Sequence, residues 1–249
     1  MAIPPEDRRS DVADGHPATF DDPAPSYTGA ANLEAMEEAR NYNALLTSIV
    51  YTHADRARPV LDFGAGNGTH AKHLRHMGLD VHCVEPDAAL RAGLKDSGFD
   101  AVATVDALGP GRFGTTYSFN VLEHIEEDLS AVRALTAALS HGGRMILYVP
   151  AFQVLFSEMD RAVGHYRRYR RDQLTGMVET AGLEVMAAEY VDSLGFLAAL
   201  MYRLIRGSGD LDPRAVGFYD RAVFPVSRLI DRFTARTVGK NLLVVGRRD

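Results

Sequence analysis

Residues 60–70 read Val-Leu-Asp-Phe-Gly-Ala-Gly-Asn-Gly-Thr-His, a short apolar run that leads into a glycine-rich turn and then into a helical pattern. Gly64 and Gly66 lack a Cβ atom, so the backbone can turn tightly there and approach a ligand. The helix expected to begin at residues 68–69 presents N–H groups that no helical carbonyl accepts. The stretch therefore predicts a strand, a turn and a helix start that bind a nucleotide-like ligand.

Strand and helix patterns alternate on both sides of this turn. Because parallel strands are joined by right-handed helical crossovers, the alternation predicts an α/β protein with a mostly parallel sheet. The expected strands are residues 59–63, 80–85, 99–103, 115–120, 144–149, 183–191 and 241–246. The expected helices are residues 29–53, 69–77, 87–97, 126–139, 172–181, 193–206 and 214–236. Asp87 and Asp172 are the expected N-caps of two of these helices.

The chain divides into an arm and one domain. Residues 1–28 carry several prolines among charged residues, which predicts a disordered or loosely draped arm. With 249 residues, of which 46% are hydrophobic, the rest suffices for one well-packed domain at 29–249. Within it, residues 151–182 and 193–236 follow the predicted central strands and are expected to face the second substrate.

Overall charge and composition exclude several classes of protein. The formal net charge is −6, which disfavours nucleic acid as a partner. Cys83 is the single cysteine, so no disulfide forms within the chain and a cytoplasmic location is expected. The start has no signal-peptide pattern, and the apolar stretch at residues 193–202 is about half of the ~20 residues that span a bilayer.

Polar residues follow the turn at informative spacings. Glu85 lies 19 residues beyond Gly66 at the end of the next strand, where a carboxylate can accept hydrogen bonds from both hydroxyls of a ribose. Asp106 and Ala107 follow the third strand, where a carboxylate and a backbone N–H can bind an adenine edge. Nicotinamide dehydrogenases share the ribose-binding acid, but their turn reads G-x-G-x-x-G, whereas this one reads Gly-Ala-Gly-Asn-Gly.

Taken in order with Asn-Val-Leu-Glu-His at residues 120–124, these motifs resemble the class I S-adenosylmethionine-dependent methyltransferases. The likeness is to the small-molecule branch, which includes ubiquinone-pathway-like methyltransferases, and it covers about residues 30–191. It implies methyl transfer from S-adenosylmethionine and a Rossmann-like, seven-stranded, mostly parallel sheet with helices on both faces. Residues 241–247 fit the family's last strand, which is antiparallel.

The resemblance implies a role for each residue that matches a motif. Asp62 and the backbone of the turn would hold the methionine moiety, Asn120 would lie near its amino group, and Val121 beside the sulfonium. Tyr42 would close over the methionine carboxylate. The complete expected cofactor-binding set is Tyr42, Asp62, Gly64, Ala65, Gly66, Glu85, Pro86, Asp106, Ala107, Asn120 and Val121.

Residues for the methyl acceptor are expected beyond the fourth and fifth strands, because open α/β sheets bind ligands at the carboxyl ends of their strands. His124 lies four residues past Asn120, where a neutral imidazole can take a proton; its alternative role is to cap or support the next helix. No metal is expected, because Glu123 with Asp128 is a thin basis for a carboxylate cluster.

Residues 160–171 form a second candidate region, rich in arginine and tyrosine. Arginine can clamp a carboxylate or phosphate, and tyrosine can stack on a substrate. A similar Gly-His-Tyr-Arg-Arg-Tyr run is found in bacterial methyltransferases encoded near glycosyltransferases, which implies acidic, glycosylated or lipid-linked acceptors. The alternative is a solvated loop paired with nearby carboxylates. The expected catalytic residues are His124, His165 and Tyr166, and the expected substrate-binding residues are Arg161, Arg167, Arg168 and Tyr169.

The expected function is methyl transfer to a small-molecule acceptor, at oxygen. Two alternatives stay open: an S-adenosylmethionine-binding enzyme of non-methylating chemistry, such as a cyclase, and a membrane-associated binding module. The two helices at residues 193–236 are apolar enough to cover the acceptor pocket as a lid, to form a homodimer or to lie on a membrane. Core packing or a lid is the most economical interpretation.

Overall fold

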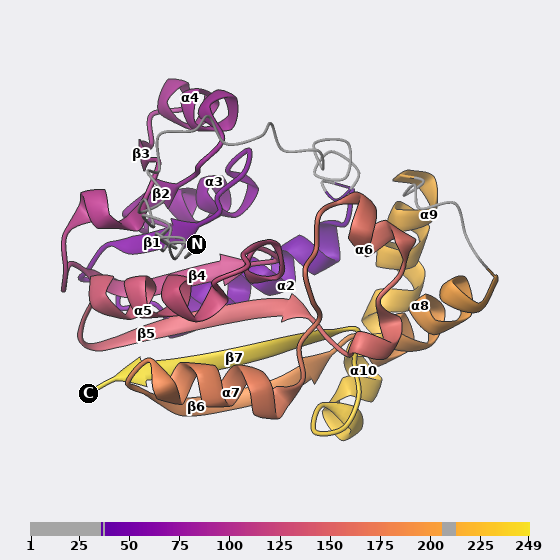
Figure 1. Cartoon of the computed structure of the whole chain (residues 1–249). Coiled ribbons are helices and arrows are strands. Elements are labelled where there is room, and N and C mark those ends of the chain that lie inside the picture. The colour runs from indigo at the N-terminus through magenta and orange to yellow at the C-terminus, as the bar shows by residue number, and fades with distance from the viewer. Residues whose placement is uncertain (1–35, 37, 206–212) are drawn as a thin grey trace, which may run out of the picture.

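The structure is a computed structural model that describes residues 36, 38–205 and 213–249 (Figure 1). Its centre is one sheet of seven strands in the order β3-β2-β1-β4-β5-β7-β6. The first five strands of this order are parallel, and β7 is antiparallel to both β5 and β6. The predicted fold class is therefore confirmed. The predicted arm at residues 1–28 lies outside the described residues, as does the predicted break at residues 207–210.

The elements follow the expected order closely. The strands are β1 (Val60–Phe63), β2 (Val81–Val84), β3 (Asp100–Val102), β4 (Phe113–Phe119), β5 (Leu139–Pro150), β6 (Leu183–Val191) and β7 (Asn241–Arg248). The helices are α2 (Arg40–His53), α3 (Thr69–His76), α4 (Ala88–Asp96), α5 (Asp128–Ala138), α6 (Glu158–Ala162), α7 (Arg171–Thr180), α8 (Ser193–Ile205), α9 (Pro213–Phe218) and α10 (Phe224–Thr234). Short helical turns connect several of them.

The sheet is buried on both faces, which is why its parallel strands are nearly continuous apolar runs. Successive side chains point to opposite faces, so the fully buried Val60 and Leu61 belong to different cores. One core is closed by α5 and α7 and contains Leu61, Val132, Leu135, Leu174 and Val178. The other is closed by α2, α3 and α4 and contains Val60, Leu46, Val50, Leu74 and Leu94.

The structure confirms one predicted N-cap and corrects the other. The Asp87 carboxylate accepts the N–H groups of Ala89 and Leu90 at 2.9 and 3.0 Å, so it caps α4. Asp172 instead lies inside the first turn of α7, and Arg170 is the N-cap residue. A carboxylate is favourable both at the N-cap and in the first turn, because it faces the positive end of the helix dipole. The charge of Asp172 therefore does not determine which residue is the N-cap.

The strand β5 begins earlier than predicted. It starts at Leu139 and includes residues 141–143, which the glycine pair suggested were a turn. Leu139 pairs with Phe113, and a register shift then aligns Arg144 with Thr115. The glycines lie at an irregularity of the ladder, a position that glycine often takes inside a strand.

The predicted long helix at 214–236 contains an irregular segment. A π-helical turn at Tyr219–Val223 joins α9 to α10. It directs the buried Asp220 carboxylate to the N-terminus of α2, where it accepts the N–H groups of Asn41 and Tyr42 at 2.8 and 2.9 Å. In Figure 1, α6 and α8 to α10 gather at the end of the sheet toward which β4 and β5 point. None of the described helices is long and apolar enough to cross a bilayer.

Candidate active site

The turn after β1 brings the chain close to the end of β4. Gly64, Gly66 and Gly68 all have positive φ angles, of 79°, 54° and 78°. A Cβ atom placed on Gly64 would lie 2.3 Å from Cγ2 of Val121, which is shorter than any real contact. Glycine is therefore required at this position for two reasons, the backbone conformation and the close approach of Val121.

Asp62 is a buried carboxyl group at the base of this turn, with 4% of its surface exposed. The Tyr117 hydroxyl donates a hydrogen bond to its Oδ2 at 2.6 Å. Burial raises the pKa of Asp62 to about 7, and the nearby Glu85 charge adds to that shift. Among the described residues no cationic side chain pairs with Asp62, so its ionised form suits a site for a positively charged ligand group.

Glu85 links the turn to the end of β2. Its carboxylate is 6% exposed and accepts the N–H of Gly66 at 2.8 Å and the N–H of Asp87 at 3.0 Å. Burial raises the pKa of Glu85, and these two hydrogen bonds oppose the shift. Each carboxylate oxygen keeps a second lone pair, so the group can still accept hydrogen bonds from a pair of hydroxyls. The neighbouring Pro86 is exposed.

Asn120 directly follows β4 in a left-handed conformation, with φ of 53°. Its side-chain amide donates a hydrogen bond to the Tyr42 hydroxyl at 3.1 Å, which brings α2 to this edge. Tyr42 also packs edge-on against Tyr148 and Phe224, with 5.8 Å between the ring centroids in each pair. A strained conformation of a residue other than glycine often marks a functional position.

The predicted cofactor residues all lie at the carboxyl ends of β1, β2, β3 and β4 or beside them on α2. Direct contacts join Gly66 to Glu85 and Asn120 to Tyr42. Asp106 and Ala107 are exposed in a short helical turn after β3. Two hollows of about 380 and 470 Å³ along α10 contain none of these residues. The candidate site is therefore located by the polar residues that gather at the strand ends, and not by the two hollows along α10.

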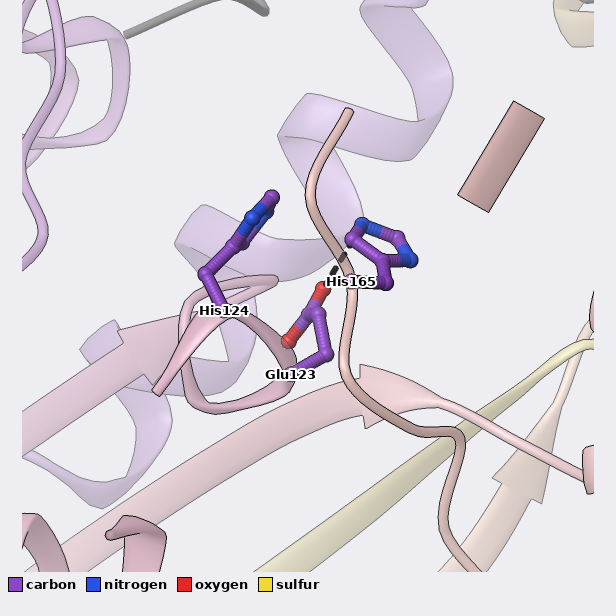
Figure 2. A group of neighbouring side chains, drawn as sticks. All are labelled: Glu123, His124 and His165. Atoms are coloured by element: carbon purple, nitrogen blue, oxygen red, sulfur yellow. Dashed lines mark ion pairs between the residues drawn. The ribbon is translucent and has the colours of Figure 1, made fainter. Parts of the chain in front are cut away.

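The predicted catalytic histidines meet a buried glutamate just beyond β4 (Figure 2). Nε2 of His165 lies 3.9 Å from Oε1 of Glu123, and the His124 and His165 rings are edge-on with 4.5 Å between their centroids. Burial raises the pKa of Glu123 to about 8. Burial, and then the neighbouring His165, lower the pKa of His124 to about 4, so its ring is neutral at pH 7.

Asp160 fixes the orientation of His165. Oδ1 of Asp160 lies 2.8 Å from Nδ1 of His165, and the Arg168 guanidinium donates to both Asp160 oxygens at 2.8 and 3.0 Å. Burial alone would raise the pKa of Asp160, but the hydrogen bonds from His165 and Arg168 hold it well below its usual range. The carboxylate is therefore ionised, and the His165 ring turns its Nε2 toward Glu123.

The predicted substrate-binding residues have partners within the protein. Arg167 pairs with Asp128 at 2.9 Å, and the Tyr169 hydroxyl donates to the same carboxylate at 2.9 Å while the ring is 2% exposed. Arg161 forms an exposed ion pair with Glu158. Substrate contact by these side chains and by Arg168 stays a prediction, and internal ion pairs account for their positions without a ligand. Tyr166 is 53% exposed at the surface.

Sequence reasoning missed several members of this arrangement. Tyr117 is the direct partner of Asp62, but a tyrosine inside a predicted strand gives no sign of it. Asp160 is one of the nearby carboxylates expected to pair with the arginines of a solvated loop, and the structure shows that it also orients His165. The signal that could have found it is the spacing of five residues between Asp160 and His165 across a short helix and a glycine.

Comparison with known proteins agrees with this geometry. A family model described as a methyltransferase domain matches residues 12–188. No curated protein matches the sequence at a significant level.

Solved structures with a similar fold include two methyltransferases and a cyclase. A methyltransferase dependent on S-adenosylmethionine from Archaeoglobus fulgidus superposes with a TM-score of 0.58 at 13% identity, covering 87% of this chain and 99% of that chain. The [4+2]-cyclase SpnF has a TM-score of 0.57 at 16% identity, covering 91% and 98%. Geranyl diphosphate C-methyltransferase from Streptomyces coelicolor A3(2), in complex with Mg²⁺, geranyl diphosphate and S-adenosyl-L-homocysteine, has a TM-score of 0.56 at 14% identity, covering 83% and 79%.

Proposed function

The chain belongs to the methyltransferase-domain family and uses S-adenosylmethionine, and we propose that it methylates a small-molecule acceptor at an oxygen atom. The observation that carries this proposal is the position of Glu123, His124 and His165. Glu123 and His124 directly follow Asn120 and Val121, the predicted neighbours of the reacting sulfonium, and His165 lies against both of them. Buried acid–base groups at this point suit an acceptor that must lose a proton.

The residues present fit the cofactor. The turn packs so closely against Val121 that residue 64 has no room for a Cβ atom. Backbone atoms, rather than side chains, therefore border the cofactor site at this point. Asp62 supplies a buried acid for the ammonium group and Glu85 a carboxylate for the ribose hydroxyls. When bound, the cofactor supplies an electrophilic methyl group for an in-line displacement.

In this proposal the remaining cofactor contacts keep their predicted roles. Asp106 and Ala107 bind the adenine, and Asn120 and Tyr42 enclose the methionine end. The protein then contributes alignment, exclusion of water and a proton acceptor. His124, neutral at pH 7, and His165, held by Asp160, are the proposed proton acceptors, and the exposed Tyr166 is the proposed contact with the acceptor.

Calorimetry of the full chain with S-adenosylmethionine and S-adenosylhomocysteine tests the cofactor site. Glu85→Gln is expected to weaken binding by about tenfold to a hundredfold, because each charged hydrogen bond contributes about 1.5–3 kcal/mol. Glu184→Gln, on the exposed edge of β6, is the matched control and is expected to bind as the wild type does. Absence of binding to both ligands in the wild type would refute the assignment.

A second candidate function is a non-methylating reaction, favoured by the similarity of this fold to the cyclase SpnF. The two reactions differ in their products. Methyl transfer adds one methyl group to the acceptor and releases S-adenosylhomocysteine in equal amount, whereas a cyclisation leaves the mass of the substrate unchanged. Mass spectrometry of reactions with hydroxylated, acidic and prenylated candidate acceptors distinguishes them.

The C-terminal helices are proposed to cover the acceptor side. Their apolar outer face includes the exposed side chains Leu197, Met201, Phe218, Leu229 and Phe233. Such a face suits a lid over an apolar acceptor, and a homodimer and membrane contact are the alternatives. Sedimentation with and without acceptor or liposomes separates the three. The proposed cytoplasmic location rests on the single cysteine, Cys83, which is buried and free of a disulfide.

A further inference from the structure

Glu123 is fully buried, and neither of its carboxylate oxygens has a hydrogen-bond partner among the described residues. A buried carboxylate without a partner is strongly unfavourable, because it loses its hydration and gains nothing in return. Groups of this kind are usually paired with a cation or bound to a metal ion. The carboxylate therefore points to a ligand.

The groups that surround this carboxylate are metal-binding side chains. One ligand atom from each of Glu123, His124 and His165 can be chosen so that all three lie within 4.8 Å of one another. Figure 2 shows the Glu123 carboxylate beside the pair of imidazole rings, with one oxygen directed toward His165. The glutamate and His124 come from the turn after β4, and His165 comes from the segment after α6.

Neighbouring groups hold the His124 and His165 rings in fixed orientations, as is usual for metal-binding histidines. Nδ1 of His165 is bonded to the Asp160 carboxylate, which leaves Nε2 for an ion, and Arg168 holds Asp160 from the other side. This is the carboxylate–histidine–metal arrangement that fixes the tautomer and the direction of a metal-binding imidazole. The His124 ring is hydrogen-bonded to the backbone of Val163 and Gly164, which orients it as well.

We propose that Glu123, His124 and His165 bind one divalent transition-metal ion, with Zn²⁺ as the best fit. Two imidazoles and one carboxylate form a three-ligand set that leaves a fourth position open, and two nitrogen ligands disfavour Mg²⁺ and Ca²⁺. Ligands at ~2.1 Å in a tetrahedron lie roughly 3.4 Å apart. The 3.9 Å between Glu123 and His165 is close to that spacing, so small side-chain rotations complete the site.

The open position would face the acceptor side, next to Asn120 and Val121. A metal ion there would bind a hydroxyl or carboxylate oxygen of the acceptor and lower the pKa of a bound hydroxyl, whose proton would leave to solvent. With the ion bound, His124 and His165 would be its ligands, and they would act as proton acceptors only in the metal-free site. This use of the ion rests on the proposed function, whereas the existence of the site does not. The chemical class that it selects is an oxygen-bearing acceptor that can act as a metal ligand.

Titration of the full chain, stripped with EDTA and dialysed, with ZnCl₂ in a calorimeter tests the site. One equivalent is expected to bind, and Co²⁺ in its place is expected to give a visible spectrum of low coordination number. Glu123→Gln and His165→Ala are expected to weaken binding at least a hundredfold, and Asp160→Asn by 10- to 100-fold. Glu126→Gln and His73→Ala, both exposed, are the matched controls and are expected to bind as the wild type does.

Thermal unfolding separates loss of the metal from loss of the fold. Without metal, Glu123→Gln is expected to melt no lower than the wild type, because it replaces a buried carboxyl group whose oxygens have no hydrogen-bond partner among the described residues. Zn²⁺ is expected to raise the melting temperature of the wild type and not that of Glu123→Gln. A folded wild type that binds no Zn²⁺, or variants that bind as the controls do, would overturn the metal site. Absence of S-adenosylhomocysteine binding would overturn the proposed function alone.

Discussion

Replacement of Gly64 by alanine tests how the turn after β1 is built. The residue has a φ of 79°, and alanine in that conformation costs roughly 1–2 kcal/mol. The new Cβ atom would also lie 2.3 Å from Cγ2 and 2.8 Å from Cγ1 of Val121. Relieving such a contact in a packed region costs about 1–3 kcal/mol. The expected loss in the free energy of unfolding is therefore about 2–5 kcal/mol.

Gly78 provides the matched control. It has a φ of 87°, but a Cβ atom there would meet nothing within 4 Å. Gly78→Ala is expected to cost only the backbone strain of about 1–2 kcal/mol. The difference between the two variants therefore isolates the contact with Val121. Urea denaturation followed by far-ultraviolet circular dichroism measures both values, which suits a chain that has no tryptophan.

A double variant completes this test. Val121→Ala removes both Cγ atoms and leaves the Cβ at 3.1 Å from the new methyl group. Gly64→Ala combined with Val121→Ala is expected to recover most of the contact cost, with a coupling energy of about 1–3 kcal/mol. Equal stability of Gly64→Ala and Gly78→Ala, or additive effects in the double variant, would refute the reasoning.

Two other predictions follow from buried carboxylates. Asp220→Ala is expected to lower the free energy of unfolding by about 1–3 kcal/mol, because two N–H groups at the start of α2 lose their acceptor. Urea denaturation measures this loss, and an unchanged midpoint would contradict it. Because the pKa of Asp62 is about 7 in the folded protein, against 3.8 when unperturbed, the native state holds the extra proton between these values. Stability of the cofactor-free protein should therefore fall as pH rises from 4 to 7, while calorimetric affinity for S-adenosylhomocysteine should rise by up to about tenfold per pH unit. Asp62→Asn should remove the pH dependence of affinity and reduce that of stability, to which the raised pKa of Glu123 also contributes. A stability profile in the variant with the slope of the wild type would show that Asp62 is not the group responsible.

The sequence predicts most of the sheet because its signals are local. Apolar strand runs and glycine-rich turns place the seven strands, and the spacing from Gly66 to Glu85 gives a contact that the structure contains. The start of β5 was misplaced because the glycines at 142 and 143 suggest a turn, whereas the pairing of Leu139 with Phe113 extends the strand. That pairing depends on a distant segment, which no local pattern reveals.

The candidate site was only partly predictable, for the same reason. His124 and His165 were each predicted as catalytic residues. Their contact with each other could not be predicted, because they follow different elements that are far apart in the sequence. Glu123 was considered for a metal together with Asp128 and set aside as a thin basis for a carboxylate cluster. Its burial and its lack of a hydrogen-bond partner appear only in the folded chain. The arginines at 167 and 168 indicated a ligand clamp, yet their carboxylate partners Asp128 and Asp160 lie within the protein.

The C-terminal helices are connected to the cofactor edge through a short series of contacts. Asp220, in the π-helical turn, holds the first turn of α2 by two backbone N–H groups, one of which belongs to Tyr42. The Tyr42 hydroxyl accepts the hydrogen bond from Asn120, at the strained end of β4. A regular helix at residues 219–223 would rotate Asp220 away from α2, since each residue turns a helix by about 100°. The π-helical turn therefore does more than join two helices: it sets the position of the tyrosine that borders the proposed methionine site, and so links the acceptor-side helices to the cofactor.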